Sequence, residues 1–259
     1  MSLLPTKKTE ARTEDPRNLM MYGLPKCGKS SSIAQMPDTL ILDLEDGYAY
    51  LSAYVVPIRN YVDFYKICKA LREEEHNYKF VVIDTITELE NLAADLGAEN
   101  YKKTLQGKNF MGTGKDLLNL PMGAGYKQQK DALKQMLSWI MGDPEKGFVP
   151  TWNTILVGHV KDSQLGSNDD MMPVKALDVS KSCANMLSKM SDTIAYVYRD
   201  SETNNLMANF GDKNEVLTGA RPKHLSGKTV LLAERVLNED GDYDIVTHWD
   251  NIFKSLAKN

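Results

Sequence analysis

The chain has 259 residues, of which 42% are hydrophobic and 25% are charged. This composition excludes a disordered chain and predicts an ordinary packed core. The formal net charge is -4 and the pI about 5.7, which excludes a global basic field for nucleic acid, so any such contact needs a local patch. The three cysteines are far apart and form no CxxC pair, which argues against a disulfide framework or a zinc site and favours the reducing cytoplasm.

Neither a membrane span nor a signal peptide is predicted at the start of the chain or elsewhere. No apolar run is long enough for a transmembrane helix, so no membrane partner is expected. The start is polar and lacks the apolar core of a signal peptide. We therefore expect a flexible arm over residues 1–16, followed by a single domain over residues 17–259.

Apolar runs and helical spacing alternate along the chain. Buried strands are predicted at 18–22, 39–44, 79–83, 153–157 and 192–198, and helices at 28–35, 61–75, 87–103, 126–141 and 179–190. This alternation implies βαβ units, and so an α/β fold with a mostly parallel central sheet and helices on both faces. Short apolar runs with a hairpin signal at 238–242 predict a short antiparallel extension over about 200–259. Two segments break the pattern, at 104–125 and 161–175, and are expected to be loops.

The segment Gly23–Ser30 reads GLPKCGKS and matches the phosphate-binding pattern G-x-x-x-x-G-K-S in full. It follows a predicted strand and opens a predicted helix, as the pattern requires. Its glycines allow the backbone to curl so that successive N–H groups face phosphate oxygens. Lys29 is expected to reach the β- and γ-phosphates of ATP, and the Ser30 hydroxyl to bind Mg²⁺. The residues predicted to contact ATP are Gly23, Leu24, Pro25, Lys26, Cys27, Gly28, Lys29, Ser30 and Ser31.

Three further strand ends carry polar residues that would complete a catalytic site. Asp84 follows four apolar residues and is expected to hold Mg²⁺ at the carboxyl edge of the sheet, mostly through a water. Glu45 is predicted to be the base that polarises the attacking water, with Asp43 as the runner-up. The alternative for Glu45 is a solvated acidic turn. His159 ends the fourth strand and either senses the γ-phosphate or merely caps the strand.

Positive charge is concentrated between residues 101 and 134. Seven lysines against two aspartates give this segment a charge of +5, and three aromatic residues lie among the lysines. Aromatic platforms in a basic groove are typical of single-strand binding, whereas the alternative is a solvated helix–loop–helix face. We expect modest, salt-sensitive binding without sequence specificity. The candidate DNA contacts are Lys103, Lys108, Phe110 and Lys115 in the first loop, and Lys161 and Lys175 in the second.

The order of the motifs resembles that of the RecA-like ATPases. After the P-loop come D-x-E-x-G at 43–47, VVIDT at 81–85 and GHVKD at 158–162, and this order is similar to the phage-encoded Sak-type recombination and annealing ATPases. The resemblance covers about residues 17–235. It implies a Mg²⁺-dependent, DNA-stimulated ATPase of the host cytoplasm, with Glu45 as the catalytic glutamate, His159 as the sensor, and single-strand-binding loops at about 104–125 and 161–177.

The same resemblance implies an assembly. Family members form rings or filaments with ATP between subunits, and they work beside a single-strand-binding protein. A basic residue is donated to the site by the neighbouring subunit. The candidates for that residue are Lys181, Arg199, Arg221 and Lys223.

Other functions are compatible with a P-loop. One is a motor of the helicase or packaging type, although the chain is short for a motor. Another is a small-molecule kinase, although the 104–125 segment lacks the clustered arginines of a kinase lid. A third is a scaffold that assembles when it binds ATP but hydrolyses little of it.

Overall fold

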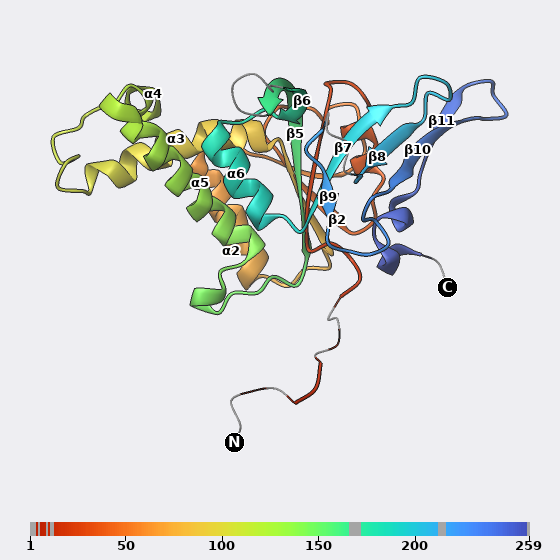
Figure 1. Ribbon diagram of the computed structural model, residues 1–259, viewed down its shortest axis with the longest axis horizontal. Helices are drawn as coiled ribbons and strands as arrows, with labels where there is room; N and C mark the ends of the chain where they lie inside the picture. Colours follow the sequence, from red (N-terminus) through yellow and green to blue (C-terminus); the bar gives the residue numbers. More distant parts are fainter. Residues whose placement is uncertain are drawn as a thin grey trace.

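In the computed structural model, a single mixed sheet joins strands from the whole length of the chain (Figure 1). The structure describes residues 4, 6–8, 10, 13–165, 172–211 and 216–257. Six neighbouring strands are parallel, in the order β3-β2-β4-β5-β1-β7. Their bounds are β1 (Asn18–Gly23), β2 (Thr39–Asp43), β3 (Tyr54–Pro57), β4 (Phe80–Asp84), β5 (Asn153–Leu165) and β7 (Thr193–Arg199).

The register of the parallel strands brings several strand ends to one edge of the sheet. Gly23 of β1 is paired with His159 of β5, and Asp43 of β2 with Asp84 of β4. Strand β5 lies between β1 and β4, so the P-loop and Asp84 are one strand apart. Because all of these strands run in the same direction, the polar residues that follow them meet at one edge.

An antiparallel extension continues the sheet beyond β7. Strands β8 (Leu206–Asn209), β10 (Thr229–Leu237) and β11 (Tyr243–Thr247) follow in that order, and the short β9 (Gly219–Ala220) also pairs with β7. The predicted hairpin turn joins β10 to β11, where the Asn238 N–H donates to the Asp242 carbonyl (2.8 Å). The predicted extension is therefore confirmed.

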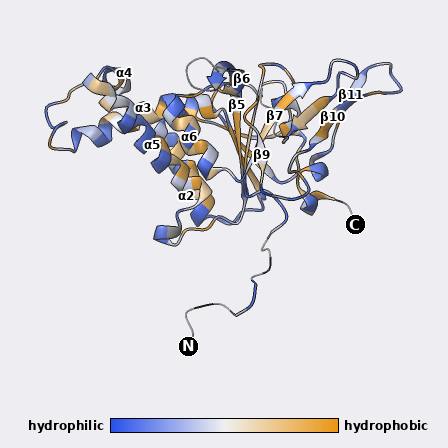
Figure 2. Ribbon diagram, in the orientation of Figure 1, coloured by the Kyte–Doolittle hydropathy of each residue, from blue (hydrophilic) through white to orange (hydrophobic). Residues whose placement is uncertain are grey.

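Helices cover both faces of the sheet, as predicted, but unequally (Figure 1). Four helices pack on one face: α2 (Tyr61–Glu73), α3 (Ile86–Lys102), α5 (Ala124–Met141) and α6 (Lys181–Met190). The other face carries α1 (Lys29–Ala34) and the 3-10 turns Trp249–Asn251 and Lys254–Leu256. Figure 2 shows apolar residues along the central strands and on the inward sides of the helices. The Trp249 indole N–H donates to the Ser32 carbonyl (2.9 Å), which joins the end of the chain to α1.

The segment 104–125 is more ordered than predicted. It contains α4 (Gly114–Leu118) and a 3-10 turn at Pro121–Gly123, and another 3-10 turn follows α5 at Pro144–Lys146. Thr113 and Asp116 form a capping box at the start of α4. A Cβ at Gly125 would lie 1.9 Å from the Leu117 carbonyl oxygen. The sequence suggested that the glycines of this segment interrupt helices, but Gly125 instead allows α5 to pack closely against α4.

The prediction of a loop over 161–175 is also partly wrong. Strand β5 continues to Leu165 and pairs with the antiparallel β6 (Met172–Leu177), while 166–171 lie outside the described residues. The β5 half of this hairpin is polar over 161–164, which hides the apolar signal of a strand, whereas Val174, Ala176 and Leu177 of β6 are buried. The edge strand β3 was not predicted for a similar reason, since it has only four residues and its end residues Tyr54 and Pro57 are exposed.

The chain start is described only in part, and the expectation of a flexible arm over 1–16 lies partly outside the described residues. Within the described part, the Asp15 carboxylate accepts backbone N–H groups from Lys254 (2.5 Å) and Ser255 (3.1 Å), so it contacts the last 3-10 turn. Among the described helices, none has both the length and the apolar character to cross a membrane.

Candidate nucleotide-binding site

The P-loop connects β1 to α1 and has the curled backbone that its sequence predicts. Gly28 has φ +113°, a left-handed conformation that side chains other than glycine's rarely adopt. A Cβ at Gly28 would also lie 2.5 Å from Nη2 of Arg199. Position 28 therefore requires glycine for two independent reasons: the left-handed backbone conformation and the close approach of the Arg199 side chain.

Lys29 is buried at the base of this loop, with 6% of its surface exposed. Its ammonium group donates to the carbonyls of Gly23 (3.0 Å) and Leu24 (2.9 Å). A buried ammonium requires such acceptors. A bound triphosphate would offer phosphate oxygens in their place.

A cavity of about 530 Å³ opens beside the P-loop. This volume lies within the range of small-molecule sites, about 300–1,000 Å³. The cavity joins the P-loop to the three strand ends selected from the sequence. Its lining consists of Pro25, Lys26, Gly28, Lys29, Ser30, Ser31, Glu45, Gly47, Leu51, Asp84 and His159.

Ser30 and Asp84 meet at the floor of this cavity. The Ser30 hydroxyl donates to Oδ2 of Asp84 (3.0 Å). Burial raises the pKa of Asp84, an effect opposed by the hydrogen bonds from Tyr48 and Ser30. One hydroxyl and one carboxylate suit Mg²⁺, which binds oxygen atoms and shares its coordination with substrate phosphates and water. No cluster of three or more His, Cys, Asp or Glu residues that could hold a metal occurs in the part of the chain that the structure describes.

Glu45 and His159, the predicted base and the predicted sensor, form a direct pair. The His159 Nε2 atom lies 3.0 Å from Oε1 and 3.1 Å from Oε2 of Glu45. A carboxylate only accepts, so Nε2 must carry a proton. His159 Nδ1 is buried and has no hydrogen-bond partner among the described residues. The Thr85 hydroxyl donates a further hydrogen bond to Oε1 (2.7 Å), so several groups hold Glu45 in place.

Asp43, the runner-up for the base, has a different position. It is buried, and its Oδ1 accepts the backbone N–H groups of Glu45 (3.1 Å) and Gly47 (3.2 Å). It is not among the residues that line the cavity. The structure therefore places Asp43 as the support of the turn that carries Glu45, and favours Glu45 for the base.

Two residues of the site were missed by sequence reasoning. The Tyr48 hydroxyl donates to Oδ2 of Asp84 (2.6 Å), and nothing in the sequence spacing indicates this contact. Thr85 also caps α3, because its side chain accepts the Glu88 N–H (3.3 Å). The Thr-x-x-Glu pattern does indicate a helix start, but not the bond to Glu45.

Arg199 braces the P-loop from the outside. Its Nε–H donates to the Cys27 carbonyl (2.7 Å) and its Nη1–H to the Asn204 carbonyl (2.9 Å). A loop whose N–H groups turn inward leaves carbonyls facing outward, and these need donors. Arg199 thus acts within its own chain, whereas the sequence suggested it only as a residue donated by a neighbour.

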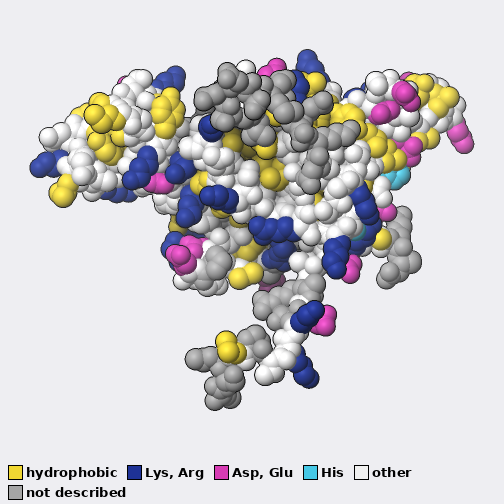
Figure 3. All heavy atoms as spheres, viewed as in Figure 1, with side chains coloured by type: hydrophobic (Ala, Val, Ile, Leu, Met, Phe, Trp, Pro, Cys, Tyr) yellow, Lys and Arg dark blue, Asp and Glu magenta, His cyan; other side chains and the backbone are white. Residues whose placement is uncertain are grey.

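The lysine-rich segment forms a lobe, defined here as residues 101–134, that projects from the sheet with α4 near its tip (Figure 1). Lys103, Lys108 and Lys115 are exposed and form no ion pair within the described residues, and Figure 3 shows lysine and arginine side chains over this end of the molecule. Phe110 packs against Tyr101 with ring centroids 5.4 Å apart, so it is only partly exposed. The lobe therefore presents unpaired cations to solvent.

The lysines of the β5–β6 hairpin are paired instead. Lys161 donates to the Val179 carbonyl and lies 3.5 Å from the Asp178 carboxylate. Lys175 forms a salt bridge with Asp162. Their charges are therefore partly neutralised by neighbours, unlike those of the lobe.

The candidates for a residue donated to a neighbour lie apart from one another. Lys181 is the exposed first residue of α6. Arg221 and Lys223 are exposed, and the Arg221 N–H donates to the Asp192 carbonyl (3.0 Å) just before β7 begins. Arg221 therefore lies at the amino edge of the sheet, opposite the P-loop of its own chain.

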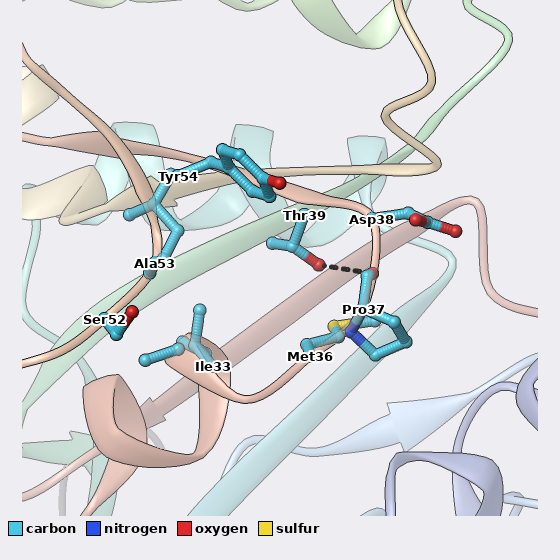
Figure 4. Close-up of a pocket in the computed structure, with 10 residues that line it drawn as sticks. Ile33, Met36, Pro37, Asp38, Thr39, Ser52, Ala53 and Tyr54 are labelled. Carbon is cyan, nitrogen blue, oxygen red and sulfur yellow. Dashed lines mark hydrogen bonds between the residues drawn. The ribbon is translucent and has the colours of Figure 1, made fainter.

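A second cavity, of about 370 Å³, lies at that amino edge (Figure 4). Its lining consists of Ile33, Ala34, Met36, Pro37, Asp38, Thr39, Ile41, Ser52, Ala53 and Tyr54. The Thr39 hydroxyl donates to the Pro37 carbonyl (2.9 Å), and Asp38 pairs with Lys79 outside the cavity (2.8 Å). No lysine or arginine is among these lining residues, so this cavity does not suit a triphosphate.

Comparison with known proteins gives one family match. A family described as an AAA domain matches residues 15–230. Among solved structures, the RadB recombinase is 14% identical with a TM-score of 0.41, over 89% of this chain and 92% of that chain. The KaiC-like protein PH0186 from the hyperthermophilic archaea Pyrococcus horikoshii OT3 is 11% identical with a TM-score of 0.41, over 90% and 89%. A search of curated proteins finds no significant match.

Proposed function

The chain belongs to the family of AAA domains, and on this basis we propose that it is a Mg²⁺-dependent ATPase that binds single-stranded DNA and acts in DNA recombination or annealing. The observation that carries the proposal is the convergence on one cavity of Lys29, Ser30, Asp84 and Glu45. These four residues supply a phosphate cation, two metal ligands and a base, the set that phosphoryl transfer to water requires.

ATP binds with its phosphates in the P-loop, over Gly23–Ser31. Lys29 exchanges its carbonyl partners for the β- and γ-phosphate oxygens. Ser30 and Asp84 would hold Mg²⁺, which would supply positive charge to those phosphates. Arg199 keeps the loop in shape through the Cys27 carbonyl.

Glu45 accepts a proton from the attacking water. Its carboxylate is already held by Thr85 and His159, so its position is restricted before the substrate arrives. Such preorganisation lowers the barrier because less reorientation is needed in the transition state. His159, in contact with Glu45 and at the cavity wall, senses the γ-phosphate and passes its loss to the β5–β6 hairpin that follows it in the chain.

Single-stranded DNA binds first to the lysine-rich lobe. Its exposed lysines Lys103, Lys108 and Lys115 pair with phosphates, and Tyr126, half of whose surface is exposed, offers a ring for base stacking. Phe110 contributes through its exposed edge. Lys161 and Lys175 would first have to leave their carboxylate partners, so their share of the binding is smaller.

The resemblance of the motifs to the phage Sak-type, RecA-like ATPases supports the biological setting. It suggests a ring or filament of copies of this chain in the host cytoplasm, beside a single-strand-binding protein. In such an assembly the site of one copy receives a basic residue from the next, with Lys181 and Arg221 as candidates. Because strands from β1 to β11 belong to one sheet, we treat residues 17–259 as a single ATPase domain.

Phosphate release by the purified protein, with and without single-stranded DNA, tests the proposal. We expect ATP turnover that requires Mg²⁺ and that single-stranded DNA increases. The increase caused by DNA should be smaller at about 200 mM salt than at about 50 mM salt. Glu45→Gln should lower turnover by roughly 10²–10⁴-fold, the range for a general base, and retain ATP binding. Full turnover by Glu45→Gln would show that another group is the base.

A second candidate function is an ATP-gated scaffold. It is favoured by the hydrogen bonds that already engage both oxygens of Glu45, because part of this bonding has to be given up when the carboxylate takes a proton. A scaffold would assemble on adding ATP without releasing phosphate. Light scattering, which detects assembly, in the same reactions as phosphate release distinguishes the scaffold from the ATPase.

A further inference from the structure

Tyr48 is a buried tyrosine that contacts Asp84 of the nucleotide site but is not among the residues that line the cavity. Only 4% of its surface is exposed, and its hydroxyl lies 2.6 Å from Oδ2 of Asp84. A carboxylate only accepts hydrogen bonds, whereas a phenol hydroxyl can donate one. The tyrosine is therefore the donor in this bond and the carboxylate the acceptor.

The carboxylate of Asp84 is oriented by two donors on the same oxygen. Oδ2 accepts from both Ser30 (3.0 Å) and Tyr48, while Oδ1 accepts no hydrogen bond from the described residues. Two donors on one oxygen restrict rotation of the group about its last bond. This arrangement leaves Oδ1 available to a metal.

Tyr48 also belongs to the segment that carries Glu45. The turn after β2 is closed by Asp43, which accepts the N–H groups of Glu45 and Gly47, and the Leu51 N–H then donates to the Tyr48 carbonyl (3.0 Å). Beyond these local bonds, the hydroxyl of Tyr48 links this turn to the end of β4. A shift of Asp84 on metal binding would therefore be transmitted to the turn.

We propose that Tyr48 is a positioning residue for Mg²⁺: its hydroxyl orients the Asp84 carboxylate and ties to it the turn that bears Glu45. One hydroxyl group then links metal binding to the placement of the base. The inference rests on the proposed ATPase function and adds to it a residue that does not touch the nucleotide phosphates.

The variant Tyr48→Phe removes only the hydroxyl, and Tyr50→Phe is a matched control because Tyr50 is fully exposed two residues away. The probe is a fluorescent ATP analogue, whose binding is measured in EDTA and during a Mg²⁺ titration. For Tyr48→Phe we expect unchanged affinity in EDTA and about a tenfold higher Mg²⁺ concentration at half-saturation, as for loss of a hydrogen bond to a charged group. Tyr50→Phe should match the wild type.

The same titration is then made in the Asp84→Asn background. If Tyr48 acts through Asp84, Tyr48→Phe has no further effect on the Mg²⁺ titration there. Equal Mg²⁺ dependence of Tyr48→Phe and Tyr50→Phe overturns the inference, and so does an undiminished effect in the Asp84→Asn background. Unchanged affinity in EDTA shows that the variant is folded. Wild-type protein that binds the analogue without any Mg²⁺ effect would instead overturn the proposed Mg²⁺-dependent function itself.

Discussion

His159 and Glu45 form a hydrogen-bonded contact, with Nε2 at 3.0 Å and 3.1 Å from the two carboxylate oxygens. The two residues are 114 positions apart in the chain: Glu45 follows the end of β2, whereas His159 lies within β5, paired with Gly23 at the end of β1, and so does not end its strand as predicted. The proposed sensor thus holds the proposed base directly. A change at His159 can alter the base without any intermediate group.

Replacing His159 with Ala should uncouple ATP turnover from DNA. Glu45 keeps its bond from Thr85 but loses the contact that responds to the β5–β6 hairpin. We expect the ratio of DNA-stimulated to basal turnover to fall toward one. This fall corresponds to the loss of a coupling free energy between the DNA site and the ATP site of about 1–3 kcal/mol. The measurement is phosphate release at saturating ATP over a range of DNA concentrations.

The pair of His248 and Glu234 offers a matched control for that experiment. Its Nε2–Oε1 distance is also 3.0 Å, but it lies in the antiparallel extension. His248→Ala should leave DNA stimulation unchanged. If both variants lose stimulation equally, the effect comes from general destabilisation and not from the contact with Glu45.

Replacing Lys103, Lys108 and Lys115 with Gln should weaken single-strand binding and reduce its salt dependence. Each phosphate contact that is lost should make the slope of log K against log salt shallower by about 0.7. Replacing Lys161 and Lys175 should have a smaller effect, since both are already paired with carboxylates. Fluorescence anisotropy of a labelled oligonucleotide at several salt concentrations measures both sets. A larger effect from the hairpin pair would contradict the assignment of the lobe.

Asp84→Asn should stabilise the protein in the absence of nucleotide while abolishing Mg²⁺-dependent turnover. Burial holds the pKa of Asp84 above its usual range, so the native state favours the protonated form more than the unfolded state does. The charged group therefore destabilises the fold above its unfolded pKa, and this penalty shrinks as the pH falls through the folded pKa. We expect a gain of roughly 1 kcal/mol near pH 7 that narrows in acid. Thermal unfolding in EDTA from neutral to acidic pH checks this, and lower stability of the variant at neutral pH would contradict it.

Arg199→Ala should weaken ATP binding by about tenfold, because the Cys27 carbonyl loses a charged donor. Arg235 is a suitable control, since it lies close enough to influence Arg199 electrostatically but is exposed on β10. Arg235→Ala should retain wild-type affinity. Equal losses in both variants would indicate that positive charge, and not the brace on the P-loop, supports binding.

Much of the fold follows from local patterns in the chain. The strand ending at Gly23 and the strand ending at Asp84 are continuous apolar runs that stop at a glycine or an acid, which is typical of strands buried in a parallel sheet. The amphipathic helices are equally clear. Prediction failed at the β5–β6 hairpin and at α4, because the polar stretch 161–164 of β5 and glycines at helix contacts look like loops in the sequence.

The sequence by itself determined the P-loop and the residues at the ends of the parallel strands, because a backbone curl and a strand end are local properties of a few consecutive residues. Only the tertiary structure decided that Tyr48 meets Asp84, that His159 meets Glu45, and that Arg199 supports its own P-loop. These contacts join residues 36, 114 and 172 positions apart. The order of strands across the sheet sets them, and no periodicity along the chain encodes that order.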